Sequence, residues 1–75
     1  MPLIEVTIVE GVFSDSQKKQ IIKDLTDTMV SIEGENLRPY TVVLLHEVKS
    51  ADWGVGGKAF TTDDIKTVAS GMPSG

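Results

Sequence analysis

Residues 2–10 read PLIEVTIVE, a β-branched stretch in which apolar and polar side chains largely alternate. The alternation predicts a strand with Ile4, Val6 and Ile8 on one face. Residues 40–48 read YTVVLLHEV and predict a second strand. The middle of this second stretch is nearly continuously apolar, which is typical of a strand that is covered on both faces.

A helix is predicted between the two strands. Ser14 is its expected N-cap, because Gln17 three residues later completes a capping box. Gly34 is expected to end the helix as a left-handed cap. Apolar residues recur at spacings of three and four and predict one buried stripe, which two further residues widen. The stripe consists of Ile22, Leu25, Met29 and Ile32, widened by Ile21 and Val30.

Strand, helix and strand in this order form a β-α-β unit, so the fold class is α/β. The two strands are expected to be parallel, with a right-handed crossover. Beyond them, residues 53–57 read WGVGG and predict a tight turn or a small hairpin that leads into residues 58–60.

The end of the chain predicts one more short helix. Thr61 or Thr62 is its expected cap, and the helix runs through Val68. Residues 1–75 are therefore expected to form a single domain, in which residues 69–75 are a loose tail.

Composition excludes several classes of function. The chain has no cysteine and one histidine, so it has no disulfides or thiol chemistry, and His46 cannot build a metal site unaided. The net charge is −4, and no basic cluster exceeds Lys18 and Lys19, so nucleic acid is not an expected partner. With no signal-peptide pattern and no apolar run of about 18 residues, a cytoplasmic protein without a membrane partner is expected.

The size of the chain predicts self-association. A chain of this length buries only about 60–65% of the surface that its unfolded form exposes, which makes a lone core marginal. One helix covers one face of a two-stranded sheet, and the other apolar face needs a partner. Without disulfides or a metal, a second copy of the chain is the expected partner.

The order of motifs along residues 2–60 resembles that of the 4-oxalocrotonate tautomerase family. The resemblance rests on the joint placement of five features on one β-α-β unit, none of which is specific alone. They are the Met1-Pro2 start, a strand ending in Glu10-Gly11, the helix opening SDSQKK, a second strand ending in Glu47-Val48, and an aromatic residue followed by GVGG.

The resemblance implies a β-α-β fold with a parallel two-stranded unit, a C-terminal hairpin and a short helix, completed by oligomerisation. In this family the chains form dimers that usually group into hexamers. It also implies keto–enol or double-bond tautomerisation without cofactor or metal. The nitrogen of Pro2 would move the proton within the substrate.

Pro2 becomes a secondary amine only after Met1 is removed. A terminal amine titrates near pH 8, and a secondary amine is intrinsically more basic, so an apolar surround is needed to make it a base at neutral pH. Leu3, Trp53 and Phe60 are the expected surround. The alternative is that Pro2 reflects only a common processing signal. With Met1 retained, its nitrogen is an amide and cannot act as a base.

The chain departs from the family at its carboxylate-binding arginines. Val12 and Val42 stand where the family pattern has them, which puts a dicarboxylate substrate in doubt. Arg38 is the only arginine. It is expected to open the second strand at the edge where Pro2 opens the first, and to bind a substrate carboxylate there. The alternative is that Arg38 pairs with Glu35 or with a neighbouring subunit.

Trp53 stands where the family has its active-site aromatic residue. It is expected to form an apolar wall over Pro2 of an adjacent subunit, and the alternative is simple interface packing. His46 lies at the far end of its strand from Pro2 and is interpreted as a structural histidine.

Together these features predict a homo-oligomeric tautomerase that acts on a small enolisable keto acid or an unsaturated acid. Pro2 is the predicted general base and acid, and Trp53 and Arg38 are the predicted substrate-binding residues. The alternative function is a non-catalytic oligomeric ligand-binding or scaffold protein with the same fold.

Overall fold

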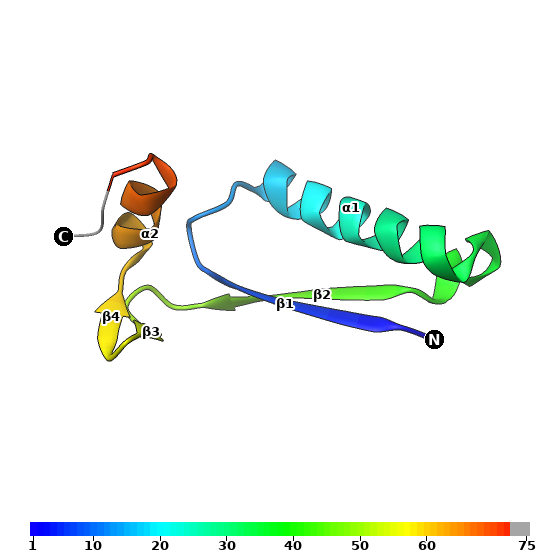
Figure 1. Cartoon of the computed structure of the whole chain (residues 1–75), viewed down its shortest axis with the longest axis horizontal. Helices are drawn as coiled ribbons and strands as arrows, with labels where there is room; N and C mark the ends of the chain where they lie inside the picture. Colours follow the sequence, from blue (N-terminus) through cyan, green and yellow to red (C-terminus); the bar gives the residue numbers. More distant parts are fainter. Residues whose placement is uncertain (73–75) are drawn as a thin grey trace. The chain divides into compact units, whose positions relative to one another are not determined.

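The computed structural model describes residues 1–72 of the chain. Figure 1 shows the elements found in this part and labels the strands and the α-helices. They are β1 (Leu3–Val9), α1 (Asp15–Glu33), the 3-10 helix η1 (Glu35–Tyr40), β2 (Val42–Val48), β3 (Trp53–Val55), β4 (Lys58–Phe60) and α2 (Thr62–Ala69). No helix among residues 1–72 is long and apolar enough to cross a membrane.

The chain divides into two compact units, which are described separately. The first unit contains residues 1–6 and 14–46, and thus the start of β1, α1, η1 and most of β2. The second unit contains residues 7–13 and the chain from residue 47 onward, with β3, β4 and α2.

β1 and β2 pair as parallel strands, as the sequence predicted. The backbone N–H of Val42 donates to the carbonyl of Pro2 at 3.1 Å, where both strands begin. The N–H of Glu10 donates to the carbonyl of Val48 at 2.8 Å, where both strands end. Residue numbers therefore rise in the same direction along the two strands, which defines a parallel pair.

Exposure alternates along both strands, because successive side chains point to opposite faces of a sheet. Ile4 and Val6 are half-buried, and α1 runs along their sheet in Figure 1. On the opposite face, Leu3 is 56% exposed, and Val42 and Leu44 are each 42% exposed. Within the described part of the first unit, β2 is thus covered on one face only, and no element covers the apolar side chains of the other face.

The start of α1 follows the sequence prediction. The hydroxyl of Ser14 accepts a hydrogen bond from the N–H of Gln17 at 3.1 Å, and the Gln17 side chain accepts one from the N–H of Ser14 at 2.9 Å. This reciprocal pair is a capping box. α1 ends at Glu33 with Gly34 as its C-cap, as predicted, but the conformation of Gly34 differs from the prediction. Gly34 has φ 102° and ψ 154°, which is not the left-handed helical conformation, and the chain continues directly into η1.

The predicted stripe of α1 is wrong at two positions. Ile32 is 80% exposed and Ile22 is 39% exposed, whereas Val30 is only 4% exposed. Ile21 and Leu25 are half-buried in the first half of the helix, while Val30 is the buried residue of the second half. The buried face shifts around the helix axis along its length, as expected when a straight helix lies on a twisted sheet.

The second strand was predicted to begin at residue 40, and this is wrong. Arg38 and Tyr40 lie in η1, and β2 begins at Val42. The N–H of Leu37 donates to the carbonyl of Gly34 at 3.2 Å, which is the three-residue spacing of a 3-10 turn. Pro39 lies inside this turn, where its fixed φ suits helical backbone.

In the second unit, β3 and β4 form an antiparallel hairpin whose two strands pair Trp53 with Phe60 and Val55 with Lys58. The connection is the two-residue loop Gly56-Gly57, with φ values of 58° and 84°. Positive φ at both positions is what a tight hairpin loop requires, and glycine adopts it without steric cost.

α2 follows the hairpin and begins at Thr61, the first of its two predicted caps. The Thr61 hydroxyl accepts from the N–H of Asp64 at 3.1 Å, and the Asp64 carboxylate accepts from the N–H of Thr61 at 3.0 Å. Thr62 instead donates its hydroxyl to the carbonyl of Glu10 at 2.6 Å. Residues 73–75, the end of the predicted tail, lie outside the described residues.

Candidate active site

Pro2 belongs to the first unit and is half-buried at the start of the sheet. Its carbonyl is held by the N–H of Val42 at 3.1 Å. By the alternation of β1, Pro2 lies on the same face as Ile4 and Val6, which are also half-buried. Met1 precedes it and is 88% exposed. Pro2, the predicted catalytic residue, is therefore bound to β2 through its carbonyl and preceded by an exposed residue.

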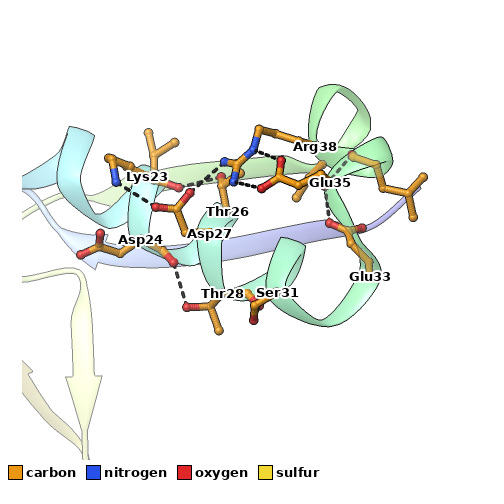
Figure 2. Close-up of polar contacts among 12 residues, drawn as sticks. Lys23, Asp24, Thr26, Asp27, Thr28, Ser31, Glu33, Glu35 and Arg38 are labelled. Carbon is orange, nitrogen blue, oxygen red and sulfur yellow. Dashed lines mark hydrogen bonds and ion pairs between the residues drawn. The ribbon is translucent and has the colours of Figure 1, made fainter.

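Arg38 is held by two carboxylates of the first unit, as Figure 2 shows. Its Nε donates to Glu35 Oε2 at 2.9 Å, and its Nη2 donates to Glu35 Oε1 at 3.0 Å. Its Nη1 donates to Asp27 Oδ1 at 2.8 Å. The second oxygen of Asp27 accepts from Lys23 Nζ at 2.8 Å. We call these four residues the ion cluster. It joins α1 to η1 and includes the pairing of Arg38 with Glu35 that the sequence left open.

The charges of the ion cluster stabilise one another. The hydrogen bonds that Arg38 donates to Glu35 and then to Asp27 raise the pKa of Arg38 above its ordinary value. The hydrogen bond from Arg38 lowers the pKa of Glu35, and those from Lys23 and then Arg38 lower the pKa of Asp27. All four groups are thus charged at neutral pH. For the predicted substrate role, the Arg38 guanidinium would have to exchange these carboxylates for that of the substrate.

The residues after η1 contain contacts that the sequence analysis missed. The hydroxyl of Thr41 lies 2.5 Å from Glu33 Oε2 and 2.9 Å from the carbonyl of Leu37. The other carboxylate oxygen of Glu33 is buried and has no hydrogen-bond partner among the described residues. Thr41 immediately precedes Val42, which holds Pro2. The end of α1 is therefore connected through Thr41 to the residue that anchors the candidate base. Nothing in the local sequence pattern indicates this contact.

Trp53 belongs to the second unit, where it is half-buried on β3. Its cross-strand partner is Phe60, which is also half-buried. Alternation along the hairpin puts Trp53, Val55, Lys58 and Phe60 on one face, which we call the hairpin face. The Nζ atom of Lys58 lies 5.0 Å from the centre of the Phe60 ring, a cation–π contact. The sequence analysis assigned no role to Lys58.

The remaining candidate residues among residues 1–72 do not gather into a second candidate site. His46 is exposed near the end of β2. Among residues 1–72, no group of three His, Asp or Glu side chains could hold a metal ion. Pro2 and Arg38 lie in the first unit and Trp53 in the second, so each is described within its own unit.

Comparison with known proteins identifies the fold. The chain matches the crystal structure of an apo unfused 4-OT with a TM-score of 0.70 and 28% identity. The match covers 79% of this chain and 93% of that one. The fold is therefore that of small tautomerases. The crystal structure of DmpI from Helicobacter pylori matches with a TM-score of 0.66 and 33% identity, over 77% and 94% of the two chains. The predicted fold class is thereby confirmed: a parallel β-α-β unit, an antiparallel hairpin and a short helix.

Sequence comparison agrees with the fold. The family model described as Tautomerase enzyme matches residues 2–63. The probable tautomerase K2 of Dickeya dadantii is 36% identical over 61 residues, which cover 81% of this chain and 90% of that protein. The probable tautomerase Cj0270 of Campylobacter jejuni is 31% identical over 70 residues, which cover 93% and 98%. The chain belongs to the 4-oxalocrotonate tautomerase family.

Proposed function

We propose that this protein is a cofactor-independent tautomerase that moves a proton within a small enolisable keto acid or unsaturated acid, with Pro2 as general base and then general acid. The observation that carries the proposal is the position of Pro2. It directly follows Met1 and immediately precedes β1 in a chain that belongs to a tautomerase family.

The chemistry requires that Met1 be removed. Met1 is 88% exposed, and the ladder between β1 and β2 begins only at the Pro2 carbonyl, so the Met1–Pro2 bond lies outside the paired part of the strand. Hydrolysis of that bond converts the Pro2 nitrogen from an amide to a secondary amine. The amine takes the proton of an enol hydroxyl, and its conjugate acid returns a proton to the substrate carbon, which yields the keto form.

The pocket requires self-assembly. Leu3, Val42 and Leu44 expose apolar side chains on the uncovered face of the β1–β2 sheet. Burying such a surface against another copy releases its hydration and lowers the free energy of the assembly. We propose a homo-oligomer built from dimers, a hexamer in its complete form, in which Trp53 of one subunit forms an apolar wall over Pro2 of another.

The test compares the mature protein with Pro2→Ala, using enolic phenylpyruvate and a 2-hydroxydienoate as substrates. Intact mass first establishes whether Met1 is absent from the purified protein. Pro2→Ala should reduce kcat about 100-fold or more, the usual scale of a lost general base. Pro39→Ala is the matched control, because it makes the same substitution in η1 of the same unit and should retain activity. Equal kcat in Pro2→Ala and the mature protein would refute the mechanism.

One observation favours the alternative of a non-catalytic binding or scaffold protein. Valines occupy the two arginine positions of the family pattern, and the only arginine, Arg38, is bound to Glu35 and Asp27. A mature protein that lacks Met1, assembles, and turns over neither substrate would support this alternative over the enzyme.

A further inference from the structure

We propose that Thr62 is a positioning residue for the candidate active site, because its hydrogen bonds fix the hairpin of β3 and β4, and thereby Trp53, to the end of β1. Thr62 acts through Trp53 rather than by contact with the substrate. The inference rests on the proposed function, since it concerns the apolar wall that this function assigns to Trp53.

Thr62 bonds to two segments that are distant from it in the sequence. Its hydroxyl donates to the carbonyl of Glu10 at 2.6 Å, and its backbone N–H donates to the hydroxyl of Ser50 at 2.9 Å. The N–H of Ser50 donates in turn to Glu10 Oε1 at 3.2 Å. We call these three residues the Thr62 network. It joins the residue after β1, the connection between β2 and β3, and the first residue of α2, all within the second unit.

The methyl group of Thr62 is held as closely as its hydroxyl. A Cβ atom at Gly11 would lie 3.1 Å from Thr62 Cγ2, which is shorter than an ordinary carbon–carbon contact of about 3.5–4.0 Å. Gly11 also has φ 78°, a conformation that glycine adopts without steric cost. Glycine after Glu10 therefore lets Thr62 approach the backbone at the end of β1. Both branches of the Thr62 side chain are fixed there.

A short path of backbone contacts leads from the Thr62 network to Trp53. Phe60, two residues before Thr62, pairs directly with Trp53 across the hairpin. The carbonyl of Phe60 accepts from the N–H of Ala51 at 3.0 Å, and Ala51 directly follows Ser50. Ala51 has φ 74°, which is uncommon for a residue other than glycine and persists where the surrounding contacts determine the backbone. The chain is thus held on both sides of the pair of Trp53 and Phe60.

The other threonines near the start of α2 bond within their own helix. The hydroxyl of Thr61 accepts from the N–H of Asp64 and caps α2. The hydroxyl of Thr67 donates to the carbonyl of Asp63 at 2.8 Å, one turn earlier in α2. Thr62 and Thr67 are both half-buried, and both donate to a backbone carbonyl. They differ in that the Thr62 bond reaches β1, so Thr67 is a matched control.

Loss of the Thr62 hydroxyl should weaken substrate binding more than catalysis. A hydrogen bond of this kind changes an equilibrium by about tenfold. Without it the hairpin also occupies arrangements in which Trp53 is displaced, and the apparent affinity falls with the fraction of molecules in the competent arrangement. KM should therefore rise. The proton transfer itself depends on Pro2, which belongs to the first unit, so kcat should stay nearly constant.

The test measures steady-state kinetics with enolic phenylpyruvate and the quenching of tryptophan fluorescence by acrylamide. Trp53 is the single tryptophan of the chain, so quenching reports its accessibility directly. Thr62→Val keeps the shape of the side chain and removes the donor. It should raise KM about tenfold, keep kcat within about twofold and increase the quenching of Trp53. Thr62→Ser keeps the donor and should restore the wild-type values, and Thr67→Val should leave them unchanged.

Several results would overturn the inference. They are wild-type KM and quenching in Thr62→Val, a fall in kcat at constant KM, failure of Thr62→Ser to restore KM, and equal effects in Thr67→Val. Circular dichroism establishes that each variant folds. If Thr62→Val does not fold, Ser50→Ala decides, because it removes the acceptor of the Thr62 N–H and leaves Thr62 in place. It should raise KM and the quenching of Trp53, and unchanged values would reject the inference.

The quenching measurement separates this inference from the proposed function, because it needs no turnover. Lost turnover in Pro2→Ala with wild-type quenching in Thr62→Val rejects the role of Thr62 and keeps the tautomerase. Full turnover in Pro2→Ala with increased quenching and increased KM in Thr62→Val rejects the proline mechanism and keeps Thr62 as the residue that positions Trp53.

Discussion

Leu44→Ala should weaken the assembly of the protein. Leu44 lies on the uncovered face of the β1–β2 sheet and is 42% exposed in the single chain. Full burial of a leucine contributes about 1.5–3 kcal/mol, so an interface that covers the exposed part gains about 0.6–1.3 kcal/mol per copy. A two-fold interface contains the residue twice. Because alanine keeps the Cβ atom, the dissociation constant of a dimer should rise about 5- to 50-fold.

The assay is analytical ultracentrifugation over a dilution series of the mature protein and the variant. Ile22→Ala is the matched control, since Ile22 is 39% exposed but lies on α1 rather than on the open sheet face. The control removes the same number of carbon atoms and should leave the dissociation constant unchanged. A wild-type protein that sediments as a single subunit at all concentrations would refute the reasoning, and so would a Leu44→Ala variant that assembles as tightly as the wild type.

Two further predictions concern the first unit. Val30→Ala should lower the free energy of unfolding by about 1.5–2.5 kcal/mol, because Val30 is 4% exposed. Ile32→Ala should change it by less than about 0.5 kcal/mol, because Ile32 is 80% exposed. Chemical denaturation measures both values, and a larger loss in Ile32→Ala would contradict the assignment of the buried face. The pKa values of Asp27 and Glu35 are lower in the folded chain than their ordinary values of 3.8 and 4.5. Both carboxylates therefore stabilise the fold at pH values above their ordinary pKa. This stabilisation is lost as the pH falls through their lower pKa values in the folded chain. The double variant Asp27→Asn, Glu35→Gln should therefore lose less stability than the wild type between about pH 5 and pH 2, and identical pH profiles would show that the ion cluster does not contribute.

The parts of the fold that depend on local sequence signals could be predicted. The alternation of residues 2–10 gave β1 to within one residue at each end, and the capping box of Ser14 and Gln17 gave the start of α1. The glycines after Trp53 gave the hairpin. Each of these signals lies within a few residues and reflects backbone conformation or capping, which neighbouring residues determine.

The errors arose where contacts between distant residues decide the structure. Arg38 was predicted to open the second strand, but it lies in η1, where it bonds to Asp27, eleven residues earlier. Ile32 fits the spacing of the predicted stripe, yet the buried face of α1 shifts toward Val30 near the end of the helix. Neither the ion cluster nor the direction of the helix on its sheet is encoded in a local pattern.

The residues of the candidate site also divide into those that sequence signals predict and those that depend on contacts between distant residues. Pro2 and Trp53 were predicted as site residues from their places in a recognisable order of motifs. The contact between Lys58 and the ring of Phe60 was not predicted, because it depends on the positions of side chains along the hairpin. Glu33 and Thr41 were also missed, since their contact joins the last turn of α1 to the residue before β2. Strand register brings Lys58 close to Phe60 in the second unit, and the end of α1 brings Glu33 close to Thr41 in the first.

The first hydrogen bond of the β1–β2 ladder, from Val42 to the carbonyl of Pro2, has a consequence for maturation. Cutting the bond before Pro2 removes none of the ladder, so trimmed and untrimmed chains offer the same strand pairing and can join the same complex. In a mixed population, an untrimmed chain would be an inactive subunit that does not inhibit the trimmed subunits of the same oligomer. The total catalytic activity would then rise in proportion to the fraction of trimmed chains. The aminopeptidase that removes Met1 would therefore set this activity.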